Sequence, residues 1–118
     1  MKSIIPIMVA GLVASSNGVA KTPDCTGPEH WPASMAYAQL KNAGVLSSDT
    51  VNFDRVTSVR VASEKIEADL WRQVHRVRFP LKNRKVVLVL TVSDTSSEEC
   101  SMGDVQIYVV SRIPEGKR

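Results

Sequence analysis

The two cysteines of this chain, Cys25 and Cys100, restrict its possible folds more than any other feature of the sequence. They are the only cysteines among the 118 residues, and an even number of cysteines in an exported chain favours a disulfide bond. The bond would close a loop of about 75 residues, for which the chain-entropy argument gives about 4.5 kcal/mol of stabilisation. Because small domains are stable by only about 5–15 kcal/mol, we expect this bond to contribute a large share.

The first twenty residues predict that the chain is exported. Lys2 is followed by an apolar run over residues 4–14 and then by a polar segment that ends in small residues, which is the pattern of a secretory signal peptide. The run is too short to cross the roughly 30 Å hydrocarbon layer as a permanent helix. We therefore expect cleavage after Ala20, a periplasmic or secreted location and no permanent membrane anchor. A retained anchor or a buried first strand is the alternative.

The remaining residues, 21–118, have the length of one domain. Lys2 leaves with the signal, so the other basic residues exceed the 12 acidic ones by only about two. No block of like charge, low-complexity run or internal repeat occurs. A strongly basic stripe with interleaved aromatic residues is also missing, so we predict no nucleic-acid ligand.

The apolar pattern predicts one helix followed by four strands. Residues 32–44 combine a proline suited to a first turn, alanines at spacings of three and four, and a glycine stop. From Val56 onward apolar and polar residues alternate and β-branched residues dominate, which is typical of strands. The expected strands cover residues 56–66, 70–79, 85–93 and 105–112. A second helix through residues 63–74 is the alternative, because Ser63 fits an N-cap before apolar residues at helical spacing.

Short connections between successive strands predict an antiparallel meander. We place its first turn at Ala68 and its second turn between Lys82 and Asn83. This register collects the apolar side chains on one face, against which the helix packs, and the arginines on the other face. The predicted inner face contains Val59, Val61, Trp71, His75, Val77, Phe79, Val86, Leu88 and Leu90.

This order of one helix and four strands resembles the cystatin-like α+β roll, in which a bent sheet wraps around a helix. The resemblance implies an N-terminal helix packed on a four-stranded antiparallel meander, here with one disulfide. The sequence has neither the QxVxG-type hairpin nor the Pro-Trp hairpin of cystatins, so inhibition of cysteine proteases is not implied. The chain is also similar to small exported bacterial proteins, some of which are immunity proteins or inhibitors that neutralise envelope toxins or hydrolases.

Four arginines form the first candidate binding surface. In the predicted register Arg60, Arg72, Arg76 and Arg78 project from the outer face, and Arg60 lies across from Arg76. Like charges in opposite positions destabilise a sheet, and arginine binds carboxylates in bidentate fashion. We therefore expect a protein partner with an acidic surface, since Glu64 would neutralise only Arg72. A solvated face that discourages pairing at the sheet edge is the alternative.

The second candidate surface is the acidic loop around Cys100, in which Glu98 and Glu99 are the predicted binding residues. Its acidic residues lack the regular spacing that a calcium site requires. A loop that is held by a disulfide loses less conformational entropy when it binds a partner, which favours a role in recognition.

The sequence contains no pattern that indicates an enzyme. His30 and His75 are the only histidines, and no G-x-S-x-G, H-E-x-x-H or phosphate-binding glycine motif occurs. We predict a non-enzymatic binding module without a cofactor, of the inhibitor or immunity type. The alternative is a periplasmic protein that binds a small ligand or copper, with Cys25, His30, Cys100 and Met102 as soft ligands if the thiols are free.

Overall fold

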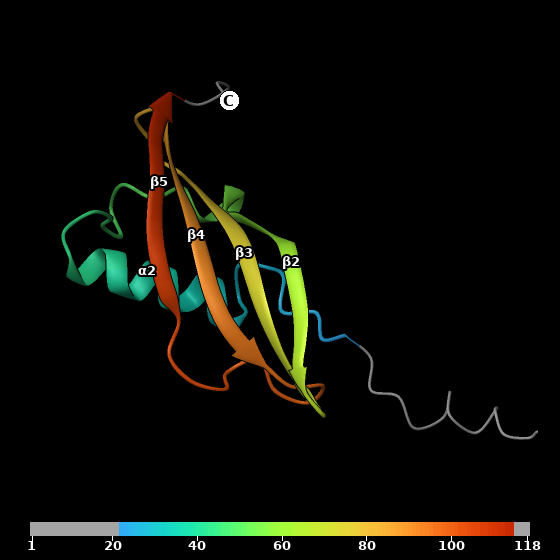
Figure 1. Ribbon diagram of the computed structural model, residues 1–118. Helices are drawn as coiled ribbons and strands as arrows, with labels where there is room; N and C mark the ends of the chain where they lie inside the picture. The colour runs from blue at the N-terminus through green and yellow to red at the C-terminus, as the bar shows by residue number, and fades with distance from the viewer. Residues whose placement is uncertain (1–21, 115–118) are drawn as a thin grey trace, which may run out of the picture.

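One helix packs on a four-stranded antiparallel sheet in the computed structural model, which describes residues 22–114 (Figure 1). The elements are the helix α2 (Trp31–Asn42), the 3-10 helix η2 (Phe53–Arg55), and the strands β2 (Thr57–Glu67), β3 (Leu70–Pro80), β4 (Lys85–Thr95) and β5 (Gln106–Pro114). The strands neighbour each other in chain order, so the predicted meander is confirmed. The predicted signal peptide, residues 1–20, lies outside the described residues.

Residues 63–74 belong to β2, to the turn that follows it and to β3, so the alternative of a second helix is wrong. In β3 every second residue is buried, including Trp71, Gln73 and His75. This period of two places the buried side chains on one face of a strand, whereas a helix would bury residues three and four apart.

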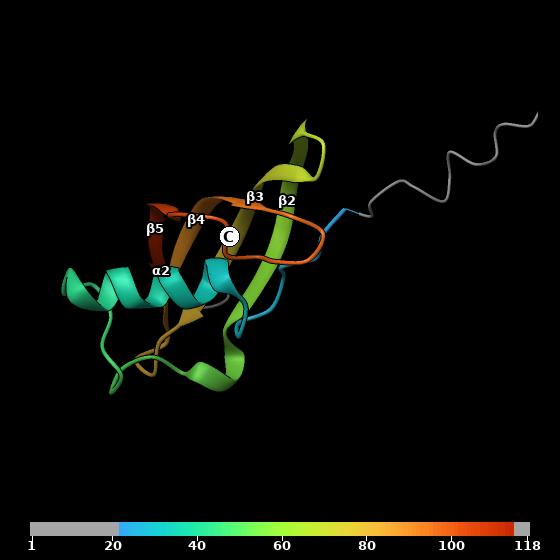
Figure 2. The same cartoon turned by 90° about the horizontal axis from the view of Figure 1, so that it is seen from below.

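The helix α2 lies on the inner face of the sheet, over β3 and β4 (Figure 2). Pro32 occupies its first turn, and Gly44 follows its end with a φ of +79°, a left-handed conformation that glycine adopts without strain. Ala33 and Ala36 are buried, so the helix backbone approaches the sheet closely. The core beneath it contains Leu40, Leu46, Val51, Val56, Val77, Phe79, Val87 and Val89.

A bulge in β2 alters the predicted pairing of the first hairpin. Two predicted pairs beside the turn are confirmed, Lys65–Trp71 and Glu64–Arg72. An extra residue at Val61 then shifts the register, so Arg60 lies opposite His75 and not opposite Arg76. The prediction that Arg60 faces outward was wrong, because a shift of one residue moves side chains to the other face. Val59 and Val61, predicted to lie in the core, are 41% and 50% exposed.

The turn between β3 and β4 also differs from the prediction. The Leu81 amide donates a hydrogen bond of 2.7 Å to the Lys85 carbonyl, and between them Arg84 has a φ of +70°. Residues other than glycine, asparagine and aspartate seldom adopt this conformation, so the sequence carries no signal for the longer turn. Phe79 therefore lies opposite Val87.

This longer turn exchanges the two faces of β4. Leu88 and Leu90, which were predicted to face the helix, lie on the outer face and are half-buried. Thr91, Ser93 and Thr95 are buried on the inner face in their place.

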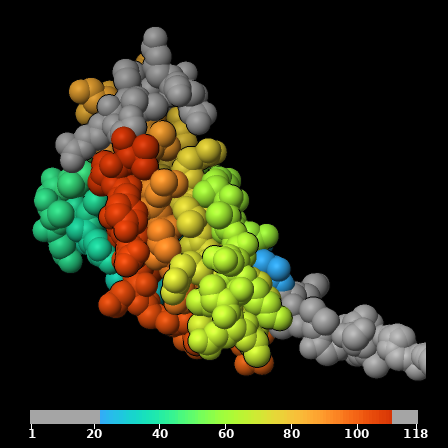
Figure 3. Space-filling model, viewed as in Figure 1, coloured from blue at the N-terminus to red at the C-terminus, as the bar shows by residue number. Residues whose placement is uncertain are grey.

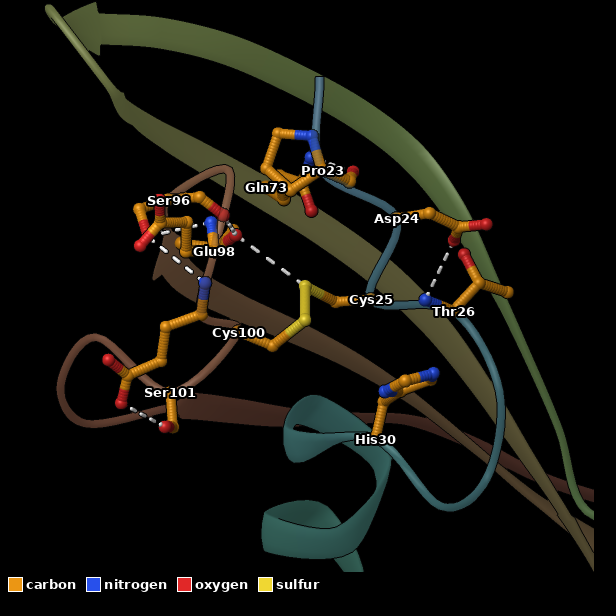
Figure 4. Close-up of a disulfide and its surroundings, with 12 residues drawn as sticks. Pro23, Asp24, Cys25, Thr26, His30, Gln73, Ser96, Glu98, Cys100 and Ser101 are labelled. Atoms are coloured by element: carbon orange, nitrogen blue, oxygen red, sulfur yellow. Dashed lines mark hydrogen bonds between the residues drawn. A yellow bond between two sulfur atoms is a disulfide. The ribbon is translucent and has the colours of Figure 1, made fainter. Parts of the chain in front are cut away.

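The predicted disulfide between Cys25 and Cys100 is confirmed, and its two Cα atoms lie 5.8 Å apart. Cys25 is fully buried, and its Sγ lies 3.5 Å from Oγ1 of Thr95 at the end of β4. The bond joins the segment before α2 to the loop between β4 and β5 (Figure 4). No helix of residues 22–114 is long and apolar enough to cross a membrane.

Candidate binding surface on the outer face of the sheet

The outer face of the sheet, which points away from α2, presents apolar and cationic side chains in the same rows. Figure 3 shows the four strands side by side on this face. Val59, Arg76, Leu90 and Tyr108 occupy paired positions on β2, β3, β4 and β5 and form one row. Tyr108 is 54% exposed, and Leu90 is half-buried between its neighbours. Large apolar side chains therefore reach solvent on both sides of an arginine.

The next row also places an arginine beside a leucine, because Arg78 of β3 pairs with Leu88 of β4. Arg76 and Arg78 lie on the same face of one strand, with their Cα atoms about 7 Å apart. Within residues 22–114 no carboxylate forms an ion pair with either guanidinium. We call this region the arginine–leucine surface, and it consists of Val59, Arg76, Arg78, Leu88, Leu90 and Tyr108.

Arg72 lies on the same face but already has an acidic partner. Its Nε and Nη2 donate hydrogen bonds of 2.9 and 3.1 Å to the two carboxylate oxygens of Asp94. The hydrogen bonds that Arg72 donates to Asp94, and the negative charge of that carboxylate, raise the pKa of Arg72. The pair lines a polar hollow of about 240 Å³ together with Asp104 and Gln106. Because Asp94 occupies the Nε–Nη2 edge of the guanidinium and balances its charge, Arg72 attracts an external carboxylate less strongly than Arg76 does.

Arg60, in contrast, has a structural role on the inner side of the sheet. Its Nη1 donates a hydrogen bond of 2.6 Å to the carbonyl oxygen of Pro23, and Nε2 of Gln73 donates to the same oxygen at 3.0 Å. These two hydrogen bonds connect the segment before α2, at Pro23, to β2 and β3. The pairing of Arg60 with Arg76, which suggested an acidic partner, does not exist.

The acidic loop with Glu98 and Glu99 lies away from the arginine–leucine surface. Two hydrogen bonds of 3.0 Å from Ser97 to Asp69 hold the loop against the turn between β2 and β3, and both glutamates are exposed. The loop follows the end of β4 at the level of Trp71, and Arg78 is seven residues, or about 23 Å, further along β3. The structure therefore does not combine the two predicted surfaces into one site.

His75 lies in a buried polar layer between α2 and the disulfide. It is fully buried, and neither of its ring nitrogens has a hydrogen-bond partner among the described residues. Burial lowers the pKa of His75, and the positive charge of Arg60 on the opposite strand lowers it further; Asp24 acts in the opposite direction. His75 is therefore uncharged at neutral pH in the folded protein.

Acidification is expected to destabilise the protein through His75. Its pKa lies below the ordinary value of 6.5 in the fold, so the unfolded chain binds the additional proton first and the free energy of unfolding decreases as the pH falls below 6.5. Urea unfolding at about pH 7.5 and about pH 5 should show this decrease, which His75→Gln should reduce. His30→Gln is the matched control and should leave the decrease unchanged. If His75→Gln lost as much stability on acidification as the native sequence, His75 would not be the group responsible.

The copper alternative loses its thiol ligands, because Cys25 and Cys100 are bonded to each other. His30 lies beside Glu29, with its Nε2 3.5 Å from the carboxylate. Met102 is 43% exposed and lies against the turn between β2 and β3. No group of three or more histidine, cysteine, aspartate or glutamate side chains within residues 22–114 has an arrangement that could hold a metal ion.

The sequence-based register missed four members of the arginine–leucine surface. Val59, Leu88 and Leu90 were predicted to lie in the core, and no outward position was predicted for Tyr108. The alternation of apolar and polar residues in β5 was the available signal for Tyr108, since it predicts an outward position for every second side chain.

Comparisons with known proteins identify no relative. No protein-family model, no curated protein and no solved structure matches the chain. The fold and the surface define the class of this protein only as a disulfide-bonded α+β domain with an uncovered cationic and apolar sheet face.

Proposed function

We propose that the protein is an exported, non-enzymatic binding module that captures a protein with an acidic surface patch. The arginine–leucine surface carries this proposal, because two arginines that pair with no carboxylate of residues 22–114 lie there among partly exposed apolar side chains. Arginine and tyrosine are enriched at the centres of protein interfaces, where few residues supply most of the affinity. The proposal assigns the chain to the inhibitors or immunity-type proteins that neutralise a toxin or hydrolase of the bacterial envelope.

The position of the surface on the sheet supports this function. Arg76, Arg78, Leu88 and Leu90 belong to the two central strands, whose backbones are hydrogen-bonded on both sides. A surface that is ordered before binding loses little conformational entropy in the complex. Two arginines about 7 Å apart also suit neighbouring carboxylates on one partner, each bound in bidentate fashion.

Export is part of the proposal, and the disulfide supports it, since such bonds persist mainly in oxidising compartments. The cystatin-like roll is the fold that we propose for this order of helix and strands. Glu98 and Glu99 would join the same interface only for a partner that extends about 20 Å along β3.

Replacement of both Arg76 and Arg78 by glutamate is expected to abolish capture of the partner. Loss of one side of a desolvated charge pair costs about 2–5 kcal/mol, and the new carboxylates add repulsion, so we expect the affinity to fall by at least about 10³-fold. A photo-crosslinking side chain at Tyr108 would trap the partner in an envelope extract for identification by mass spectrometry. The affinity of the purified partner is then measured for the native sequence and for the variant with Arg76→Glu and Arg78→Glu.

The matched control is the double substitution Lys41→Glu and Lys82→Glu, which changes the net charge by the same amount at two exposed positions elsewhere. This control should bind the partner normally, and circular dichroism should show both double variants folded. Normal capture by the variant with Arg76→Glu and Arg78→Glu would contradict the proposal. Equal loss of capture in the control would also contradict it, because net charge would then explain the binding.

A further inference from the structure

On the inner side of the sheet, α2 and η2 lie beside the end of β3 (Figure 2). The side chains there leave a cleft of about 340 Å³, which is within the range of small-molecule sites. It is lined by Pro28, Glu29, Ala33, Ser34, Tyr37, Phe53, Val56 and Phe79. This cleft is separate from the arginine–leucine surface, and binding in it is independent of the proposed function.

Three aromatic rings form the walls and floor of the cleft. Phe79 belongs to the core and is only 1% exposed, so it forms a fixed floor. The ring of Tyr37 meets the ring of Phe53 edge to face, with centroids 5.1 Å apart. Phe53 nevertheless remains 47% exposed. An aromatic side chain held in this way at the mouth of an apolar cleft can gain contact area with a ligand at little entropic cost.

The charge of the cleft restricts the ligand that it can accept. Glu29 is the one ionisable acidic or basic side chain among the lining residues that the structure describes, apart from the phenol of Tyr37. Its carboxylate is at the rim, since the side chain is 73% exposed. A carboxylate beside aromatic rings attracts a cation and repels an anion, because the faces of the rings also carry partial negative charge.

We propose that this cleft binds a small amphiphilic amine, with its alkyl or aryl body packed over Phe79 and against the rings of Tyr37 and Phe53, and its ammonium group at Glu29. The apolar body is buried against the aromatic rings, and the cationic end stays at the solvent-exposed rim. An apolar anion of the same size is rejected by the carboxylate, and a neutral analogue loses only the attraction at the rim.

Hexylamine, 1-hexanol and hexanoate are suitable probes, because they share an alkyl chain and differ at one end. The full folded chain is titrated with each probe, and the amide NMR shifts of Ala33 and Tyr37 report binding. Hexylamine should bind about two- to fivefold more tightly than hexanol, as expected of an exposed charge pair. Hexanoate should bind least. Glu29→Gln should remove the preference for the amine. Phe53→Ala should lower the affinity for both hexylamine and hexanol by about fivefold or more.

Glu98→Gln and Tyr108→Ala are the matched controls, since both positions are exposed and lie outside the cleft. Both should leave the three affinities unchanged. Absence of shifts at the cleft with all three probes would overturn the proposal, and so would equal binding of hexylamine and hexanoate. A preference for hexylamine that survives Glu29→Gln would overturn the role of the carboxylate, and folding of that surface variant is verified from the same spectra.

Discussion

Replacement of both Cys25 and Cys100 by alanine is expected to lower the free energy of unfolding by about 4 kcal/mol. The bond closes a loop of 75 residues, so its loss restores conformational freedom to most of the unfolded chain. A single domain of this size typically has about 5–15 kcal/mol of stability in total, and the variant should therefore be partly unfolded at physiological temperature. Urea denaturation and the thermal midpoint, which should fall by about 15 °C or more, measure the effect.

The native sequence with dithiothreitol is the appropriate control, because reduction removes the bond without changing the packing volume of the side chains. Reduced protein should be destabilised to a similar extent as the double variant. A loss below about 1 kcal/mol in both would show that the fold does not depend on the bond. A loss in the variant alone would instead indicate a packing defect at Cys25, which is fully buried.

Phe79→Ala is expected to have the second largest effect, a loss of about 3 kcal/mol in the free energy of unfolding. Phe79 is 1% exposed and packs in the core beneath α2 with Val77 and Val87. Its ring also forms the floor of the aromatic cleft. The space left by the ring would therefore open to solvent in part, which favours the lower end of the range of about 3–5 kcal/mol for such substitutions. Urea denaturation measures the difference.

Tyr108→Ala provides the comparison for this prediction. Tyr108 is 54% exposed on β5, so its removal should change the free energy of unfolding by no more than about 0.5 kcal/mol. If Phe79→Ala and Tyr108→Ala had equal effects, the assignment of Phe79 to the core would be wrong. The same Tyr108 variant should weaken capture of the partner, because the side chain belongs to the arginine–leucine surface.

The disulfide and Phe79 lie in different parts of one inner face. The disulfide lies at one end, where it holds the segment before α2 against a layer of buried polar side chains that includes Gln73 and His75. Phe79 lies at the other end, under the helix. Between them, β3 and β4 pack against α2 on the inner side, and the same strands present Arg76, Arg78, Leu88 and Leu90 on the outer side.

The elements of the fold could be predicted because their signals are local. The proline and glycine that bound α2, the alternation in the four strands and the short turns each act within a few residues. The pairing of Cys25 with Cys100 was predictable as well, since no other cysteine competes for either. The candidate surface was predicted only in part: Arg76 and Arg78 face outward as expected, whereas Arg60 does not.

The amino-acid sequence by itself thus determined the disulfide, the helix and the order of the strands, whereas the tertiary structure alone decided which residues share a face. The bulge at Val61 moves Arg60 to the inner side, and the left-handed Arg84 turns Leu88 and Leu90 outward. Neither irregularity has a recognisable sequence signal, because both are selected by how the side chains of the paired strands pack in the folded protein. In a strand with a side-chain period of two, one additional residue is enough to exchange core and surface.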